Sequence, residues 1–509
     1  MMDLRLLVPV LVIILLAKCE NSIAENATAD SSTIKADHAE PITTITSICT
    51  VCSCADNYVD CSNRNLETHF EKERWLNITV KVISLECNRL VHVTPFPRIV
   101  VERLILRRNR IARIDNHAFK ELVNLTELDL SDNQLTSQML QPHIFEGTFS
   151  PEAYEPLSNL QILNLGNNVL HWLHQSLFEH IADLKVLNLS GNPFGVFDYR
   201  TSIAISSLSY LEELDISYCE LRELPNHQFH NAKYLKKLNL TSNQLTVLPK
   251  SLEEARTLEY LSLDGNPIRA IDRTNAFPNL KMLRELSLRG MLNLTVIGNG
   301  GLSALTGLES LYIQNCRKLG RIEEYAIAFT TTEGTMWPPL KKLNMASNAL
   351  RYLPMLLVGR WDKLEELRLT GNQWNCDCDN QYLPSSRLSC VQRLTAYFSQ
   401  IGTVLPEYGE TLMGDNEVDE LTCSAPPEHA GKKLASLADR HLRCLDLYNA
   451  RPEKDAAVLI GILIGLLIAV PICMAFFVFW RRGFFFCGSQ GPGSFSRAFY
   501  KRASNDDDI

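Results

Sequence analysis

The stretch LKKLNLTSNQLTVLP, residues 235–249, contains the pattern from which the fold can be inferred. Around Asn243, its leucines stand at Leu235, Leu238, Leu240, Leu245 and Leu248. This spacing fits neither the 3.6-residue period of a helix nor the alternation of a long strand. A short L-x-L strand followed by a turn explains it, because the strand leucines point inward and a buried asparagine amide satisfies backbone groups in the turn.

The same skeleton, L-x-x-L-x-L-x-x-N-x-L, recurs along the chain. Its twelve copies begin at Val80, Val101, Leu125, Leu160, Leu184, Leu211, Leu235, Leu258, Leu283, Leu308, Leu340 and Leu364. The asparagine is replaced in three copies, by Cys219, Met291 and Cys316. One coil cannot bury its own leucines, so the coils are expected to stack and share a core, with Phe119, Phe178 and Phe229 filling the return path.

On these residues the chain resembles the leucine-rich-repeat family over roughly residues 80–372. The resemblance implies an α/β-type solenoid, a leucine-rich-repeat horseshoe of about 12 repeats with a concave parallel sheet, disulfide caps and one transmembrane helix. Met291 departs from the asparagine pattern at the turn of the ninth repeat.

Cysteines stand on both sides of the repeats. CTVCSCADNYVDC, residues 49–61, and NQWNCDC with the segment 423–444 look like the N- and C-terminal cysteine caps of extracellular members of this family. That resemblance implies the disulfides Cys49–Cys54, Cys52–Cys61, Cys376–Cys423 and Cys378–Cys444. The alternative for C-x2-C-x-C is a zinc site. In a chain routed to an oxidising compartment we favour disulfides.

Two apolar runs frame the chain. Residues 4–17 have the length of a signal-peptide core and lead to a small-residue cleavage site before Glu25, although a short membrane anchor is the alternative. The uncharged run 456–480 is long enough to span a bilayer, and Arg481 and Arg482 follow it at once. These features predict a single-pass type I protein of the plasma membrane, with its ectodomain outside.

The expected partition lists eight segments: signal peptide 1–24, flexible N-terminal segment 25–48, N-terminal cysteine cap 49–79, leucine-rich repeats 80–372, C-terminal cysteine cap 373–447, juxtamembrane segment 448–455, transmembrane helix 456–480 and short cytoplasmic tail 481–509. Six Asn-x-Ser/Thr signals precede the span and predict N-glycosylation at Asn26, Asn77, Asn124, Asn188, Asn239 and Asn293.

Composition and motifs bear on chemistry. With 46% hydrophobic residues and a net charge of only -8, the chain has no basic excess that would suggest nucleic acid. It contains no Gly-rich phosphate loop, Gly-x-Ser-x-Gly elbow or His-Glu-x-x-His pair. We therefore expect no enzyme activity, no catalytic residues, no cofactor and no metal.

A protein partner would meet the variable residues beside the strand leucines. The residues expected to bind it are Arg103, Arg107, Tyr260, Asp264, Tyr312 and Gln314. A solvated sheet face is the alternative for each of them. Sugars at Asn188 and Asn239 would cover the sixth repeat, with its Glu213, Asp215 and Tyr218. Long insertions at 137–159 and 323–339 are either recognition loops or neutral surface.

The last segments offer weaker signals. Gly461 and Gly465 form G-x-x-x-G, which permits close approach of two spans and so a homodimer. The C-terminus, NDDDI, resembles a ligand for a PDZ-domain protein, with an acidic solubilising tail as the alternative. Cys487 is either palmitoylated or a plain thiol.

These observations favour a cell-surface recognition or adhesion receptor that binds an extracellular protein partner. Two alternatives are an accessory subunit that acts in cis on a membrane receptor or channel, and a shed ectodomain that acts as a soluble ligand or decoy. A solenoid face is a general scaffold, so the residues do not identify the ligand.

Overall fold

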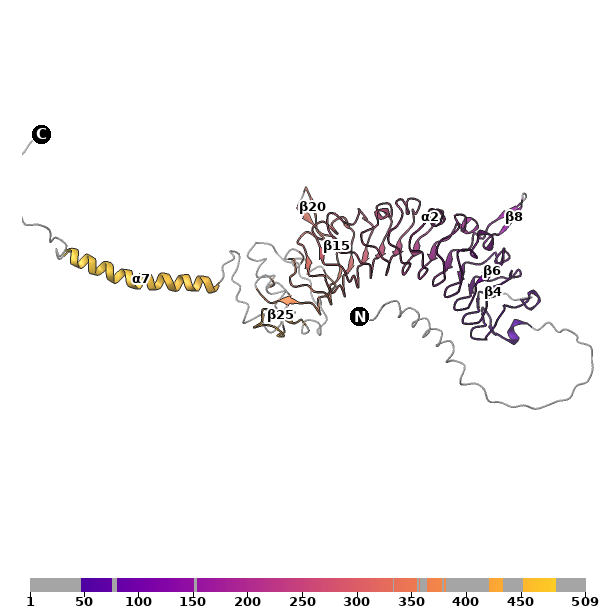
Figure 1. The fold of residues 1–509 in the computed structure, drawn as a ribbon, viewed down its shortest axis with the longest axis horizontal. Coiled ribbons are helices and arrows are strands. Elements are labelled where there is room, and N and C mark those ends of the chain that lie inside the picture. Colours follow the sequence, from indigo (N-terminus) through magenta and orange to yellow (C-terminus); the bar gives the residue numbers. More distant parts are fainter. Residues whose placement is uncertain are drawn as a thin grey trace, which may run out of the picture. The chain divides into compact units, whose positions relative to one another are not determined.

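The structure of the chain is a computed structural model. It describes residues 47–75, 80–150, 153–332, 334–354, 357, 364–377, 380, 421–433 and 452–481. The chain divides into two compact units, Met1–His441 and Leu442–Ile509. The first unit contains the solenoid and the second contains helix α7, Pro452–Arg481 (Figure 1).

The first unit is a curved solenoid with a sheet along its concave side (Figure 1). Within the described ranges this sheet has fourteen strands, all paired in parallel except the antiparallel pair β1 and β2. In spatial order the strands are β1 (Ser53–Ala55), β2 (Tyr58–Asp60), β3 (Val82–Ser84), β5 (Arg103–Ile105), β7 (Glu127–Asp129), β10 (Ile162–Asn164), β11 (Val186–Asn188), β12 (Glu213–Asp215), β13 (Lys237–Asn239), β14 (Tyr260–Ser262), β16 (Glu285–Ser287), β18 (Ser310–Tyr312), β22 (Lys342–Asn344) and β23 (Glu366–Arg368).

The return path of each coil is short and varied. One return path contains helix α2 (Tyr199–Ser206), whose first turn is capped by the Asp198 side chain. Three others contain the 3-10 turns η5 (Pro142–Ile144), η6 (Glu179–Ile181) and η7 (Lys250–Glu254). Short parallel ladders join β4 (His92–Val93) to β6 (Arg113–Ile114), and β15 (Ala270–Ile271), β17 (Val296–Ile297) and β19 (Arg321–Ile322) to one another.

Both long insertions contain antiparallel hairpins. β8 (Thr148–Ser150) pairs with β9 (Ala153–Glu155), and β20 (Phe329–Thr331) pairs with β21 (Gly334–Met336). Figure 1 shows β8 and β20 at the outer, convex edge of the solenoid, away from the sheet. The insertions therefore leave the concave face open.

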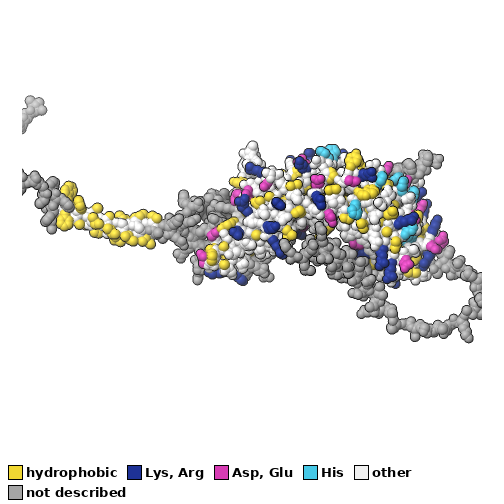
Figure 2. All heavy atoms as spheres, viewed as in Figure 1, with side chains coloured by type: hydrophobic (Ala, Val, Ile, Leu, Met, Phe, Trp, Pro, Cys, Tyr) yellow, Lys and Arg dark blue, Asp and Glu magenta, His cyan; other side chains and the backbone are white. Residues whose placement is uncertain are grey.

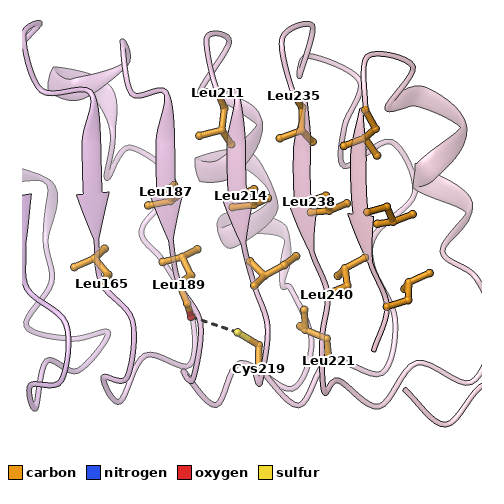
Figure 3. Packing of buried hydrophobic residues seen from close by; sticks show 14 of the residues in the cluster. Leu165, Leu187, Leu189, Leu211, Leu214, Cys219, Leu221, Leu235, Leu238 and Leu240 are labelled. Carbon is orange, nitrogen blue, oxygen red and sulfur yellow. Dashed lines mark hydrogen bonds between the residues drawn. The ribbon is translucent and has the colours of Figure 1, made fainter. Parts of the chain in front are cut away.

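The repeated leucines form one continuous core. Leu238 lies in register with Leu214 on one side and Leu261 on the other, so each leucine row runs from coil to coil (Figure 3). Leu235, Leu238 and Leu240 are fully buried. Burial of each such side chain contributes about 1.5–3 kcal/mol relative to exposure, which drives the coils to stack.

The asparagine of each skeleton joins two coils. Asn243 Nδ2 donates to the carbonyl oxygens of Ile216 and Leu240 at 2.8 and 3.0 Å, while its Oδ1 accepts the N–H groups of Cys219 and Leu221 at 3.1 and 3.0 Å. The same arrangement recurs elsewhere, as at Asn109. The buried amide thus satisfies backbone groups that no strand partner reaches.

The residue before the asparagine position of the skeleton adopts a left-handed conformation in all twelve coils, including the three in which another residue replaces the asparagine, with φ between 52° and 70°. These residues are Cys87, Arg108, Asp132, Asn167, Gly191, Tyr218, Ser242, Gly265, Gly290, Asn315, Ser347 and Gly371. The position turns the chain out of the sheet, which explains why glycine, asparagine and aspartate are frequent there.

Of the three departures from asparagine, the one at Cys219 has a local cause. In the coil before it, Phe194 donates its N–H to the Asn192 carbonyl at 2.8 Å, so the amide that other coils send to the next asparagine is already satisfied. Cys219 Sγ instead donates to the Leu189 carbonyl at 3.3 Å (Figure 3). Met291 and Cys316 are also fully buried. The turn of the ninth repeat keeps its left-handed residue, Gly290.

A tryptophan and disulfides close each end of the solenoid. At the N-terminal end, with η3 (Ile48–Thr50) and η4 (Lys72–Trp75), the structure joins Cys49 to Cys54 and Cys52 to Cys61, and buries Trp75. At the C-terminal end it joins Cys376 to Cys423 beside buried Trp374, where β24 (Trp374–Asn375) pairs with β25 (Cys423–Ala425). The implied pair Cys378–Cys444 lies outside the described residues.

The second unit contains the apolar segment. Within helix α7, residues Val458–Arg481 are long and apolar enough to cross a membrane, and none of the side chains is buried by the protein. The predicted span 456–480 lies within this helix. Arg481 is its last residue, and the predicted tail beyond it is outside the described ranges, including Cys487 and the PDZ-like end.

Candidate functional site on the concave face

One cluster of half-buried side chains on the concave sheet belongs to repeats eight to ten. Tyr260 and Ser262 flank Leu261 on β14, and the same positions carry Glu285 and Ser287 on β16 and Ser310 and Tyr312 on β18. Register places Tyr260 beside Glu285, and Ser287 beside Tyr312. The strands therefore gather two tyrosines, two carboxylates and an arginine on one surface, here called the tyrosine–arginine site: Tyr260, Asp264, Glu285, Arg289 and Tyr312.

Asp264 is held by the next coil. Its Oδ1 accepts the Ser287 hydroxyl and the Arg289 N–H, both at 2.6 Å. These bonds fix the loop that follows β16, and therefore fix the base of the Arg289 side chain. Asp264 is a positioning residue for the site as well as one of its negative charges.

Arg289 lies across the aromatic face of Tyr312. Its guanidinium carbon is 4.5 Å from the ring centroid, a distance typical of a cation–π contact. Arg289 Nε is buried and has no hydrogen-bond acceptor among the described residues. The Arg289 guanidinium therefore lies against the Tyr312 ring, and its Nε–H donates no hydrogen bond to the described residues.

Tyr260 completes the site as a neutral phenol. Burial raises the pKa of its hydroxyl, and the nearby Asp264 and Glu285 carboxylates raise it further. Gln314, in the tenth coil with Tyr312, is half-buried, and its backbone carbonyl accepts the Gly290 N–H at 2.8 Å. The predicted residues therefore lie in the eighth coil (Tyr260, Asp264) and the tenth coil (Tyr312, Gln314), on either side of the ninth.

Sequence reasoning missed Arg289 and Glu285. Both stand at variable positions of the ninth repeat, the repeat whose asparagine is replaced by Met291. A signal was present, because Glu285 holds the same skeleton position as Tyr260, and Arg289 the same position as Asp264 and Gln314.

The predicted arginines of repeat two are engaged within the chain. Arg103 forms two hydrogen bonds with Glu127, at 2.6 and 3.0 Å, and Arg107 Nε lies 2.8 Å from Glu86 Oε1. These carboxylates raise the pKa of each guanidinium. A partner that used Arg103 or Arg107 would have to share them with Glu127 and Glu86.

The sixth repeat is similarly tied to its neighbours. Lys237 Nζ bonds Glu213 at 2.6 Å, and Asn239 Nδ2 donates to Asp215 at 2.9 Å. Tyr218 is 61% exposed and occupies the left-handed position. Asn188 and Asn239 lie on β11 and β13, on either side of β12, so sugars there would project over this repeat.

Two of the other glycosylation signals lie within the described residues. Asn124 is exposed before β7, and Asn293 is half-buried with its Oδ1 accepting from Lys318 at 3.1 Å. Asn26 and Asn77 lie outside the described residues.

Figure 2 shows acidic and basic side chains interspersed over one flank, with histidines gathered near its N-terminal half. The described segments contain no group of three His, Cys, Asp or Glu residues placed to hold a metal ion.

Comparison with known proteins defines the class. The family model for the leucine rich repeat matches residues 100–148 and 209–268. CD180 antigen of Mus musculus is 30% identical over 191 residues, which cover 37% of this chain and 27% of CD180. Keratocan of Gallus gallus is 30% identical over 275 residues, which cover 46% of this chain and 72% of keratocan. The chain belongs to the leucine-rich-repeat family.

Two further proteins are similar to this chain. Podocan of Mus musculus is 28% identical over 243 residues, which cover 47% of this chain and 37% of podocan. A chain in a solved octameric complex of Latrophilin 3, Unc5D and FLRT2 is 19% identical with a TM-score of 0.39, and the match covers 78% of this chain and 99% of that one. The relatives are leucine-rich-repeat proteins of the receptor and matrix type, which supports protein binding as the broad role.

Proposed function

We propose that this protein is a single-pass type I receptor of the plasma membrane that recognises an extracellular protein through the concave face of repeats eight to ten. The observation that carries the proposal is the Arg289–Tyr312 stack, held in place through Asp264. Tyrosine and arginine are the side chains that most often dominate binding energy at protein interfaces. A side chain ordered before binding also loses less entropy when a partner arrives.

The chemistry of the site defines the partner surface that fits. The carboxylates of Glu285 and Asp264 act on Tyr260, and the Arg289 guanidinium lies over Tyr312, so the surface is mixed in charge and has aromatic side chains at Tyr260 and Tyr312. A protein patch with an exposed carboxylate for Arg289 and a basic or hydroxyl group for Glu285 complements it. Sugars on Asn188 and Asn239 would direct that partner toward repeats eight to ten.

A cell-surface binding screen tests the proposal. Full-length protein displayed on cells is exposed to a panel of multimerised secreted and cell-surface proteins, because multimers raise the avidity of weak contacts. We expect a saturable hit that is lost on Tyr260→Ala with Tyr312→Ala. Tyr199→Ala, which removes a tyrosine that is 79% exposed on helix α2, is the matched control and should bind normally.

Two results would change the assignment. A hit that survives the double tyrosine change would move recognition away from repeats eight to ten. Absence of any hit, with co-purification of one membrane protein from the same cells, would instead favour an accessory subunit acting in cis. Release of the ectodomain into the medium by cleavage between Tyr448 and Asp455 would favour a soluble ligand or decoy.

A further inference from the structure

One flank of the solenoid has charges that alternate in sign from coil to coil. In the concave sheet, the residue immediately before each of the eight strands β11, β12, β13, β14, β16, β18, β22 and β23 is charged, and these residues are here called the charge ladder: Lys185, Glu212, Lys236, Glu259, Arg284, Glu309, Lys341 and Glu365. Each ladder residue after Lys185 donates its N–H to the carbonyl of the ladder residue before it, at 2.7 to 2.9 Å. The backbone therefore sets the charges in a single row, about 4.8 Å apart and roughly 34 Å long.

The ladder remains at the surface. Lys236 pairs with Glu212 at 2.7 Å, and Glu309 pairs with both Arg284 and Lys341, at 2.7 and 2.6 Å. Between 24% and 60% of each of these side chains is exposed. Exposed ion pairs of this kind contribute little to folding stability, so pairing within one chain does not by itself account for eight alternating charges.

An alternating row with an even number of charges is complementary to itself. A two-fold rotation reverses the order, so that Lys185 faces Glu365, Glu212 faces Lys341, Lys236 faces Glu309 and Glu259 faces Arg284 of a second copy. We propose that this flank binds a second copy of the chain in an antiparallel, two-fold arrangement centred between repeats eight and nine. A slip by one coil would place like charges opposite each other along the whole row, which fixes the register.

The rows beside the ladder fit the same arrangement. The residue two positions before each ladder residue is uncharged over the central coils: exposed Tyr210 and Tyr234 stack at 5.9 Å, and Met282 is 50% exposed. The two-fold rotation brings Tyr210 to Pro339, Tyr234 to Gly307 and Met282 to Thr257. These contacts are apolar or neutral, and they add aromatic area next to the ion pairs.

The outermost positions behave as a rim. On the sheet side, the rotation places Glu213 opposite Lys342, which is again complementary. One residue further toward the convex side, exposed Arg256 would face exposed Lys281, so these two side chains have to remain in water at the edge of the contact. Interface rims are commonly polar and wet, and a like-charge pair there is tolerated better than one at the centre.

The glycosylation signals within the described ranges leave this flank open over the ladder. Asn188 and Asn239 lie within concave strands β11 and β13, and Asn293 contacts Lys318 after the strand turn. Asn124 does lie on the ladder flank, but in the third repeat, before the ladder begins. The same rotation places Tyr260 opposite Glu285 of the second copy, so the contact borders the tyrosine–arginine site.

Two exchanged-charge variants test the proposal in the full-length protein. Variant one carries Glu212→Lys with Lys236→Glu, and variant two carries Glu309→Lys with Lys341→Glu. Each keeps an opposite-charge pair within its own chain but faces like charges in a copy of itself. When the two variants are mixed, every changed residue faces an opposite charge. Recovery of association in the mixture would therefore show that both variants are folded.

The measurement is co-purification of two differently tagged copies from mild detergent. We expect wild-type copies to co-purify, each variant to lose at least about tenfold with itself, and the mixture of both variants to recover. A tenfold loss corresponds to only about 1.4 kcal/mol, which four like-charge contacts should exceed. The proposal is overturned if wild-type copies do not associate, if a variant still associates with itself, as contact through the spans alone would give, or if the mixture fails to recover.

Discussion

Replacing Asn243 by alanine tests how the solenoid is held together. The Asn243 side chain is 4% exposed and forms four hydrogen bonds with backbone groups of two coils. Alanine keeps the buried position but offers no donor or acceptor. The change therefore leaves the N–H groups of Cys219 and Leu221 buried without an acceptor.

The size of the effect follows from these two donors. Each unsatisfied buried donor costs about 1–3 kcal/mol, so the local stability of the coils should fall by roughly 2–6 kcal/mol. The Leu240 carbonyl loses one donor at a smaller cost, because Asn266 Nδ2 also donates to it at 2.9 Å. Asn164→Ala is the matched control, since Asn164 Oδ1 accepts only the Gly166 N–H, on the half-buried concave face, and should cost about 1 kcal/mol or less.

Hydrogen exchange followed by mass spectrometry provides the assay, because a long repeat array does not unfold as a single unit. Peptides that contain Cys219 and Leu221 should exchange at least about 30-fold faster in Asn243→Ala, which corresponds to the lower limit of roughly 2 kcal/mol. Exchange equal to that of wild type, or equal to that of Asn164→Ala, would refute the claim that the asparagine amide secures the turn.

Three further predictions concern buried and strained positions. Burial raises the pKa of Cys219 to about 12 and that of Cys316 to about 11, so both thiols should resist iodoacetamide at pH 8 and react only after denaturation, as mass spectrometry would show. Gly191→Ala should lower the melting temperature more than Gly290→Ala, because both have positive φ but only at Gly191 would the new Cβ meet another atom, Asn167 Oδ1 at 2.0 Å; equal melting shifts would contradict this. Cys376→Ser with Cys423→Ser opens a link across 47 residues and should cost about 4 kcal/mol, measured as faster exchange around Trp374; unchanged exchange there would show that the cap does not depend on the link.

Much of the fold follows from sequence because the repeat makes each coil predict the next. The position of Leu238 in the core is implied by Leu214 and Leu261, which carry the same neighbours and the same spacing. Two departures follow the same rule, since Cys219 and Cys316 occupy asparagine positions of the skeleton and are fully buried. Tertiary stacking, rather than local propensity, fixes these positions.

The site was only partly predictable, because its geometry depends on contacts between coils. The skeleton assigns Tyr260 and Tyr312 to the concave face, but it does not reveal that Asp264 anchors Arg289 or that Arg289 lies on Tyr312. Likewise, Arg103 looks like a free charge in sequence and is paired with Glu127 in the next coil. Cross-strand partners of this kind lie about 24 residues apart and vary independently of the leucine pattern.

Whether repeats eight to ten form the recognition surface is decided most directly at Arg289. The dissociation constant of a partner found by the cell-surface screen would be compared for wild type, Arg289→Ala and Tyr199→Ala. A central arginine of an interface typically contributes at least about 2 kcal/mol, so Arg289→Ala should weaken binding by roughly 30-fold or more, with Tyr199→Ala unchanged. Equal affinity for all three proteins would contradict the assignment of recognition to the tyrosine–arginine site.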